Sequence, residues 1–133
     1  MNTICPYCSK PSELVSGQSI YPHRKDLYSK RFYKCTPCDA YVGCHPGTEN
    51  PLGILANNEL RKARLAAHKA FDLIWQDGHL TRTTAYKCLA VKLNKSKKDC
   101  HIALFDLETC LQVIPASIII MEKLNYLIET LND

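Results

Sequence analysis

The 133-residue sequence lacks any continuous apolar run of the roughly 18 residues that a membrane-spanning helix needs. Its N-terminus also lacks the basic region and the apolar core of a signal peptide. Both absences predict a cytoplasmic protein with no membrane partner. Because thiols stay reduced in the cytoplasm, the eight cysteines are better explained as metal ligands or buried thiols than as disulfides.

The usual signatures of catalysis are also absent. The sequence contains no Gly-rich phosphate loop and no paired-carboxylate signature, and it shows no internal repeat or low-complexity segment. These absences weigh against an enzyme without excluding one, and we expect a non-enzymatic protein.

Charge is spread unevenly along the chain, although the net charge is only +4. Residues 51–99 hold ten basic and four acidic residues, whereas residues 100–133 hold one basic and five acidic residues. The basic middle of the chain could bind a polyanion such as nucleic acid. It could equally be a solvated face that is balanced by the acidic C-terminal segment.

Two Cys-x-x-Cys pairs are the most specific motif in the chain. The first cysteine pair is Cys5 and Cys8, and the second is Cys35 and Cys38. Two such pairs, separated by a polar and strand-like segment, have the spacing of a structural zinc site. Four thiolates suit Zn²⁺ and leave it no open position for water, so we predict one structural zinc ion with no catalytic role.

Cys44 and His45 follow the second pair closely and leave an alternative open. Either residue could replace Cys38 as a ligand, or could join His68 or His101 in a second metal site. We favour the two pairs, because four well-spaced cysteines already saturate one ion. The three remaining cysteines lie on or beside apolar helical positions and are predicted to be core thiols: Cys88, Cys100 and Cys110.

Short strands are predicted around the cysteine pairs. Residues 12–15 and 18–21 flank Gly17 as two strands around a turn, and residues 31–35 and 40–43 form two more. Together they make a small antiparallel ribbon with zinc at one end, within a first domain of residues 1–50. Its apolar content is thin, so metal binding should supply much of its folding free energy.

Residues 51–133 are predicted to form a helical domain. Helices are expected at residues 58–76, with Asn57 or Asn58 as N-cap, at 82–93, capped by Thr81, at 107–114 and at 116–131, with Pro115 separating the last two. The fold class is therefore α+β: an N-terminal four-cysteine zinc ribbon packed on a C-terminal bundle of about four helices. The last helix carries a wide apolar stripe, which predicts packing on two neighbours or dimerisation with another chain; the stripe comprises Ile120, Leu124, Leu127 and Leu131.

His68 and Asp72 stand four residues apart on the first long helix, so their side chains can meet. One hypothesis makes them an acid–base or metal pair, aimed at a substrate that Arg61 and Arg64 hold. The alternative, which we favour, is a hydrogen bond that locks the helix to the ribbon. Because residues 43–48 join the ribbon to this helix, Cys44, His45, His68 and Asp72 mark a candidate functional junction.

Basic and aromatic residues alternate in the ribbon. Basic side chains can follow a nucleic-acid backbone while rings stack on bases, so this pattern is typical of single-stranded nucleic-acid binding. The aromatic residues could instead form the core of a small sheet. The candidate nucleic-acid-binding residues are Arg24, Lys25, Lys30, Arg31, Tyr33, Lys34, Arg61 and Arg64, with Tyr21, Tyr28 and Phe32 among them.

Two resemblances arise from these motifs. The ribbon, with Cys5-Pro-Tyr-Cys8 and Phe32-Tyr-Lys-Cys35-x-x-Cys38, is similar to the zinc ribbons at the C-terminal end of bacterial type I topoisomerases, which bind single-stranded DNA. Most of the chain resembles a family of phage and prophage proteins described as a zinc-finger-containing domain. The residues that carry this second resemblance are Gly43-Cys-His-Pro-Gly-Thr48, Pro51-Leu-Gly53, Leu60-Arg-x-x-Arg64, Ala67-His-x-x-Phe-Asp-x-x-Trp75, Arg82-x-x-Ala-Tyr86 and His101-Ile102.

The family resemblance implies a small zinc protein of a mobile element, located in the cytoplasm of the host cell, and it brings no activity with it. Three hypotheses follow. The leading one is a non-enzymatic phage accessory protein that binds single-stranded or structured nucleic acid. The second is a regulator that binds a host or phage protein, such as an inhibitor of a host enzyme or defence system. The third is a metal-dependent enzyme that uses His45, His68, Asp72 or His101.

Overall fold

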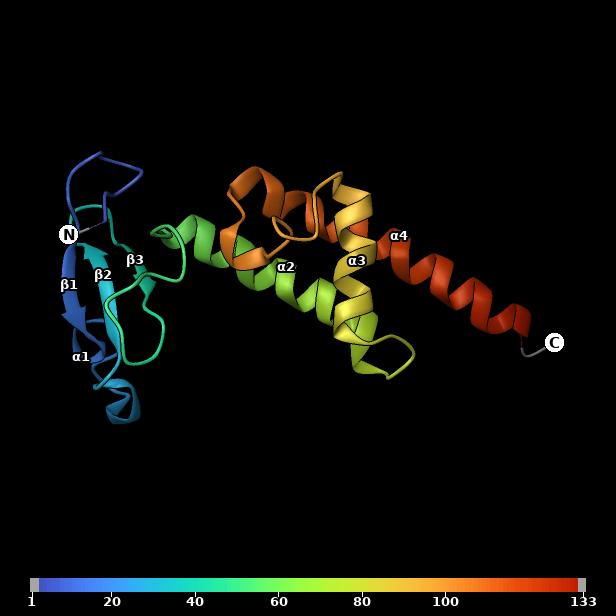
Figure 1. The fold of residues 1–133 in the computed structure, drawn as a ribbon, viewed down its shortest axis with the longest axis horizontal. Helices are drawn as coiled ribbons and strands as arrows, with labels where there is room; N and C mark the ends of the chain where they lie inside the picture. The colour runs from blue at the N-terminus through green and yellow to red at the C-terminus, as the bar shows by residue number, and fades with distance from the viewer. Residues whose placement is uncertain (1–2, 132–133) are drawn as a thin grey trace. The chain divides into compact units, whose positions relative to one another are not determined.

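A computed structural model describes residues 3–131, and the chain divides into two compact units, residues 1–61 and 62–133 (Figure 1). Each unit is described by itself. A three-stranded antiparallel sheet with four close cysteines stands at the N-terminus, and helices follow it. The α+β class predicted from the sequence is therefore confirmed.

The ribbon consists of β1 (Glu13–Ser16), β2 (Arg31–Cys35) and β3 (Ala40–Gly43), in the order β1-β2-β3. Side chains alternate between the two faces of a strand, so Tyr33 and Cys35 of β2 point to one face and Phe32 and Lys34 to the other. The face of Tyr33 and Cys35 is the buried one. It forms the core of the unit with Cys5, Ala40 and Leu55.

The segment after β1 corrects the prediction of a second strand at residues 18–21. It forms a one-turn helix, α1 (Gly17–Ile20), and a 3₁₀ turn, η1 (Lys25–Leu27), follows before β2. The chain turns at Gly17 because another backbone segment lies against it. The Gly17 N–H donates to the carbonyl of Lys30 at 2.7 Å, and a Cβ at Gly17 would lie 1.7 Å from the carbonyl oxygen of Leu27.

The connector after β3 folds back onto the ribbon. The N–H of Tyr41 donates to the carbonyl of Ala56 at 3.1 Å, and the N–H of Ala56 donates to the carbonyl of Tyr41 at 2.9 Å. Cys44 and Pro51 form a further isolated bridge. The first compact unit therefore includes the connector and runs to residue 61.

The long helices begin at the caps expected from the sequence. The Asn57 side chain accepts a hydrogen bond from the N–H of Leu60 at 3.0 Å at the start of α2 (Asn58–Gln76). The Thr81 hydroxyl accepts from the N–H of Thr84 at 3.1 Å at the start of α3 (Arg82–Leu93). The helical unit continues with η2 (Ile102–Leu104) and α4 (Leu107–Leu131), and its core includes Phe71, Ile74, Leu89, Ile102, Val113 and Ile120.

The α4 helix corrects the prediction of two helices separated at Pro115. Pro115 lies inside one helix of 25 residues. It cannot donate to the carbonyl of Leu111, which removes one helical hydrogen bond. The proline itself is exposed, whereas Val113 and Ala116 on either side are buried, so packing holds both halves of the helix in line.

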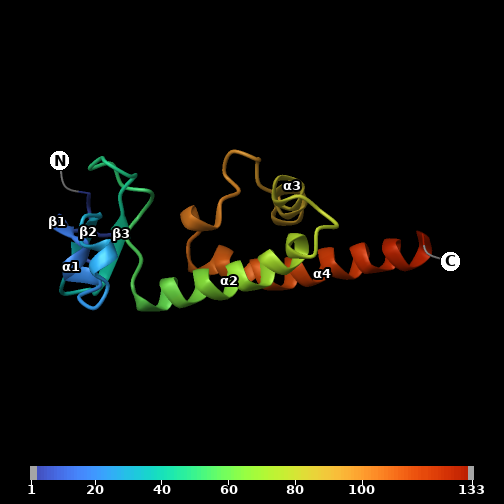
Figure 2. The same ribbon diagram turned by 90° about the horizontal axis from the view of Figure 1, so that it is seen from below.

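The apolar stripe of α4 continues beyond the residues that pack against it. Ile120 is 7% exposed, but Leu127 is 56% and Leu131 is 83% exposed, and Figure 2 shows the C-terminal part of α4 continuing past α3. By length and composition alone α4 could cross a membrane, with a mean hydropathy of 1.3 and 22% of that window buried. Length and hydropathy of this kind do not establish a membrane span, because the core helix of a globular protein can have both.

We expect Gly17→Ala to lower the free energy of unfolding of the ribbon unit by about 3 kcal/mol or more, because the added Cβ would meet a backbone carbonyl rather than a flexible side chain. Gly47→Ala is the matched control. Gly47 has φ +74° but open space around it, so only about 1 kcal/mol of backbone strain is expected. Denaturant unfolding of the zinc-loaded protein measures both, and equal losses would contradict the steric explanation.

Candidate metal centre

The two cysteine pairs lie in turns that share a left-handed residue just after the second cysteine. The first pair lies in the turn before β1, and the second pair spans the hairpin between β2 and β3. The residue after each pair takes a left-handed backbone conformation, with φ 64° at Ser9 and 50° at Asp39. In the first turn the N–H of Cys5 donates to the carbonyl of Lys10 at 2.9 Å, and the N–H of Ser9 donates to the carbonyl of Cys5 at 2.9 Å.

These turns bring the four sulfurs together. All four Sγ atoms lie within 4.8 Å of one another, and those of Cys8 and Cys35 are 3.6 Å apart. A zinc ion with Zn–S bonds of about 2.3 Å requires sulfur–sulfur edges of about 3.8 Å in a regular tetrahedron. The observed spacing therefore fits a tetrahedral four-thiolate site, and Cys38 completes it rather than Cys44 or His45.

The four thiols cannot all ionise easily without a cation. Burial acts to raise the pKa of Cys5, but hydrogen bonds from the backbone N–H groups of Tyr7 and Cys8 outweigh it, and the pKa is lowered. Burial raises the pKa of Cys38 to about 12, and hydrogen bonds with the other three sulfurs add to the rise. Four adjacent thiolates would repel one another, and a dication at the centre offsets this repulsion and holds all four sulfurs as thiolates.

The cluster is part of the hydrophobic core of the ribbon. Cys5 and Cys35 are buried, and Tyr33, Ala40 and Leu55 pack with them. The Tyr7 hydroxyl, inside the first cysteine turn, accepts a hydrogen bond from the N–H of Asn57 at 3.1 Å, so the turn is tied to the end of the connector. Because the four-cysteine site packs into the core and is tied to the connector, metal bound there stabilises the fold of the ribbon.

Cys44 and His45 lie outside the cluster, in the connector. Burial, and then the nearby charge of Glu49, raises the pKa of the half-buried Cys44 thiol. The exposed His45 donates its N–H to the carbonyl of Asn50 at 2.8 Å. Within residues 3–131, no other group of three or more metal-ligating side chains comes close enough together to hold an ion.

His68 and Asp72 lie half-buried on α2. Across the described part of the chain no hydrogen bond or ion pair joins these two side chains, so neither the predicted hydrogen bond nor an acid–base pair has a contact to support it. His101 is exposed, and its ring centroid lies 6.0 Å from that of Tyr86. The candidate junction of connector and helix stays a prediction.

Several predicted nucleic-acid-binding residues have partners within their own unit. Arg24 pairs with Asp26 at 2.8 Å and Arg31 with Glu49 at 3.3 Å, both on the surface. Arg64 donates to the carbonyl of Phe105. The three lysines of the set, which lie in the ribbon, form no ion pair within residues 3–131: Lys25, Lys30 and Lys34.

Arg61 and Tyr33 are held most firmly. The Arg61 guanidinium donates to the carbonyls of Asp39 and Ala56, each at 2.7 Å, and lies 4.2 Å from the ring centroid of Tyr41. Tyr33 is 4% exposed, and its hydroxyl donates to the carbonyl of Glu49 at 2.7 Å. Arg61 therefore fixes the connector, and Tyr33 fills the core.

The sequence reading missed Tyr41 as a surface aromatic. Tyr21, Phe32 and Tyr41 form an edge-to-face cluster with centroid separations of 5.9, 6.3 and 6.2 Å. Phe32 projects from the face of β2 opposite to Tyr33, and Tyr41 pairs with Lys34 across the sheet. The alternation of side chains along residues 31–35, together with the pairing of residues 40–43 to them, could have identified this face from the sequence.

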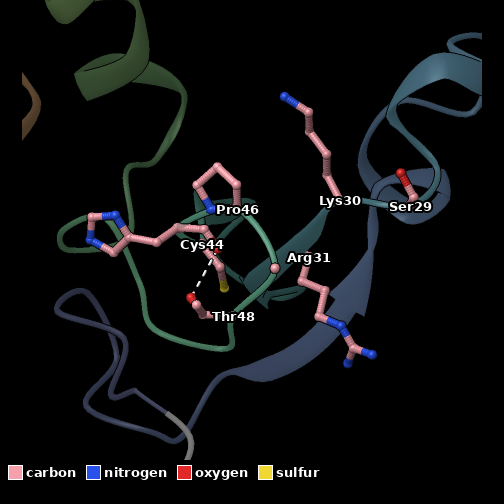
Figure 3. A pocket seen from close by; sticks show the side chains of 8 residues that line it. Ser29, Lys30, Arg31, Cys44, Pro46 and Thr48 are labelled. Carbon is pink, nitrogen blue, oxygen red and sulfur yellow. Dashed lines mark hydrogen bonds between the residues drawn. The ribbon is translucent and has the colours of Figure 1, made fainter.

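The connector also borders a hollow of about 510 Å³ beside the ribbon (Figure 3). Ser29, Lys30 and Arg31 line it from the start of β2, and residues 44–48 line it from the connector. It lies in the first unit and is separate from the four-cysteine cluster.

Comparison with known proteins agrees with the cysteine geometry. A family model described as a zinc-finger-containing domain matches residues 1–119. No curated protein and no solved structure matches the chain significantly. The donor set and the family match together show that the four cysteines hold one structural zinc ion.

Cys38→Ser is expected to abolish stoichiometric zinc binding and to unfold the ribbon, because three sulfurs leave the ion exposed and the core opens. Cys44→Ser is the control and should retain one zinc ion per chain, since its sulfur lies outside the cluster. Metal analysis and circular dichroism check both. Loss of zinc from the Cys44 variant together with retention in the Cys38 variant would reverse the ligand assignment.

Proposed function

We propose that this chain, which belongs to the family described as a zinc-finger-containing domain, is a non-enzymatic phage or prophage accessory protein that binds single-stranded or structured nucleic acid. The observation that carries the proposal is the aromatic cluster of Tyr21, Phe32 and Tyr41 on the face of the sheet that does not contact zinc. Aromatic rings are sequence-tolerant stacking partners, because every base has a π-face.

The cluster is both ordered and accessible. Tyr21 is the outermost ring at 36% exposure, and the half-buried Phe32 and Tyr41 support it from strands β2 and β3. The Arg61 guanidinium lies over Tyr41 and holds that ring in place. A base that stacks on Tyr21 would therefore meet a ring that loses little conformational freedom on binding.

Basic residues lie on the same strand as Phe32 and in the segment before it. Lys34 shares the face of Phe32 and lies across from Tyr41, while Lys25 and Lys30 stand in the segment that leads into β2. Ammonium groups without an ion-pair partner are available to phosphates, whereas Arg61 is committed to backbone carbonyls. The proposed surface therefore consists of Tyr21, Phe32, Tyr41, Lys25, Lys30 and Lys34.

The donor set argues against catalysis at the metal. Four thiolates fill the coordination of zinc, so no position remains for a water or a substrate. A zinc ion of this kind folds the ribbon and positions the rings. The function then lies in the surface of the ribbon and not in the chemistry of the ion.

The test is fluorescence anisotropy with short single- and double-stranded oligonucleotides at several salt concentrations. We expect Tyr21→Ala to weaken single-strand binding about tenfold, which corresponds to the loss of one stacked base. Tyr126→Ala, at a 68% exposed tyrosine on α4, is the control and should bind like the unmodified protein. Absent binding, or binding that salt does not weaken, would reject the proposal.

A second candidate function is protein binding through α4. The stripe that is buried at Ile120 continues uncovered at Leu127 and Leu131, next to an apolar hollow of about 340 Å³ between α3 and α4. Lys92 and Lys123 border this hollow, and a side-chain hydrogen bond with Lys123, followed by its charge, lowers the pKa of Lys92. A partner with an apolar face and an acidic edge would fit this surface.

A photo-crosslinking residue in place of Leu127 is expected to trap a protein in host cells, because this position lies on the uncovered stripe. The same residue in place of Asn125, on the opposite side of the helix, should trap none. Mass spectrometry of the products distinguishes a host or phage protein from a second copy of this chain. Equal or absent crosslinking at the two positions counts against α4 as an interface.

A further inference from the structure

The hollow beside the connector lies at one end of the β2–β3 ladder. Arg31 begins β2, Cys44 follows β3, and the N–H of Cys44 donates to the carbonyl of Arg31 at 3.0 Å. The next pair of the ladder is Phe32 with Gly43, so the hollow lies one pair along the ladder from Phe32, although the side chains of Arg31 and Phe32 project from opposite faces of the sheet. A strand stacked on the aromatic cluster would pass around this end of the ladder to reach the hollow.

The connector side of the hollow is a preformed turn. Pro46 and Gly47 are its central residues, Gly47 has φ +74°, and the N–H of Thr48 donates to the carbonyl of His45 at 3.0 Å. Proline followed by a glycine of positive φ is the arrangement of a type II turn. The Thr48 hydroxyl also donates to the His45 carbonyl at 2.9 Å, as Figure 3 shows, so this wall needs little ordering when a ligand binds.

The opposite side of the hollow carries two positive charges. Lys30 and Arg31 are both exposed, and in Figure 3 their side chains extend in different directions from neighbouring positions. Within residues 3–131, no carboxylate lies at ion-pair distance from Lys30. The Arg31–Glu49 pair is solvated, with side-chain exposures of 56% and 64%, so a phosphate can replace the carboxylate at little cost.

We propose that this hollow binds a phosphate group of the nucleic-acid strand, held by Lys30 against the turn of residues 45–48, with Arg31 placed for a neighbouring phosphate. The inference rests on the proposed nucleic-acid function and assigns the strand a fixed anchoring point. The volume of about 510 Å³ exceeds that of a phosphate and leaves room for the attached sugar. A terminal phosphate and an internal phosphodiester share this chemistry, and the experiment separates them.

The experiment compares Lys30→Gln with Lys87→Gln, an exposed lysine on α3 that lines no part of the hollow, in the full zinc-loaded protein. Lys30→Gln should weaken oligonucleotide binding about tenfold and lower the salt slope by about one unit, as the loss of one phosphate contact predicts. Lys87→Gln should change neither. Glu49→Gln should strengthen binding, because it frees Arg31 from its carboxylate.

Strands with a 5′-phosphate, a 3′-phosphate or no terminal phosphate identify the source of the bound group. If the protein prefers one phosphorylated end and Lys30→Gln removes this preference, the hollow binds a terminal phosphate. If the protein binds all three strands equally and Lys30→Gln weakens binding of each, the hollow binds an internal phosphodiester. If Lys30→Gln binds like the unmodified protein while Tyr21→Ala loses binding, the hollow is not the anchor and the nucleic-acid function stands.

If no strand binds, the nucleic-acid function fails. Nuclear magnetic resonance with inorganic phosphate then tests whether the hollow binds phosphate at all. Shifts of the Lys30 and Gly47 amide signals that Lys30→Gln abolishes would support a phosphate site with another ligand. The absence of such shifts would reject the phosphate site as well. Circular dichroism and zinc content of each variant confirm that the exposed substitutions leave the fold intact.

Discussion

The four-thiolate zinc site is the constraint on which the ribbon depends. Its four sulfurs, within 4.8 Å of one another, join the turn before β1 to the hairpin of β2 and β3. Few apolar side chains are available to replace this link, since the buried core cluster consists of Tyr33, Ala40, Leu55 and two of the cysteines, with Leu14 and Val42 packed against it. The ion therefore supplies folding free energy that a sheet of three short strands cannot obtain from burial alone.

The zinc site also decides which face of the sheet is free for binding. Because side chains alternate along β2, the face that carries Cys35 toward the ion also carries Tyr33 into the core. The other face carries Phe32 and Lys34, and Tyr21 and Tyr41 pack at the edges of the Phe32 ring. A structural metal on one face thus leaves an aromatic and basic surface on the other, which is the basis of the proposed nucleic-acid function.

The helical unit shows how local signals and packing combine. Asn57 and Thr81 act as caps as their residue types predict, and the apolar periodicity of α2 places Phe71 and Ile74 in the core. In α4 the same periodicity runs beyond its packing partners, so Leu127 and Leu131 stay exposed. Periodicity identifies the apolar side of a helix, but it does not reveal how far along the helix a neighbour covers that side.

The sequence by itself determined the metal ligands, the α+β class, strands β2 and β3, and the limits of α2 and α3, because these depend on residue spacing, alternation and caps within a few positions. Tertiary structure decided the rest. Contact with the backbone of Leu27 turned the chain at Gly17, and packing on both sides of Pro115 kept α4 continuous. Strand register buried Tyr33 and placed the half-buried Tyr41 on the opposite face, since register depends on residues distant in the sequence.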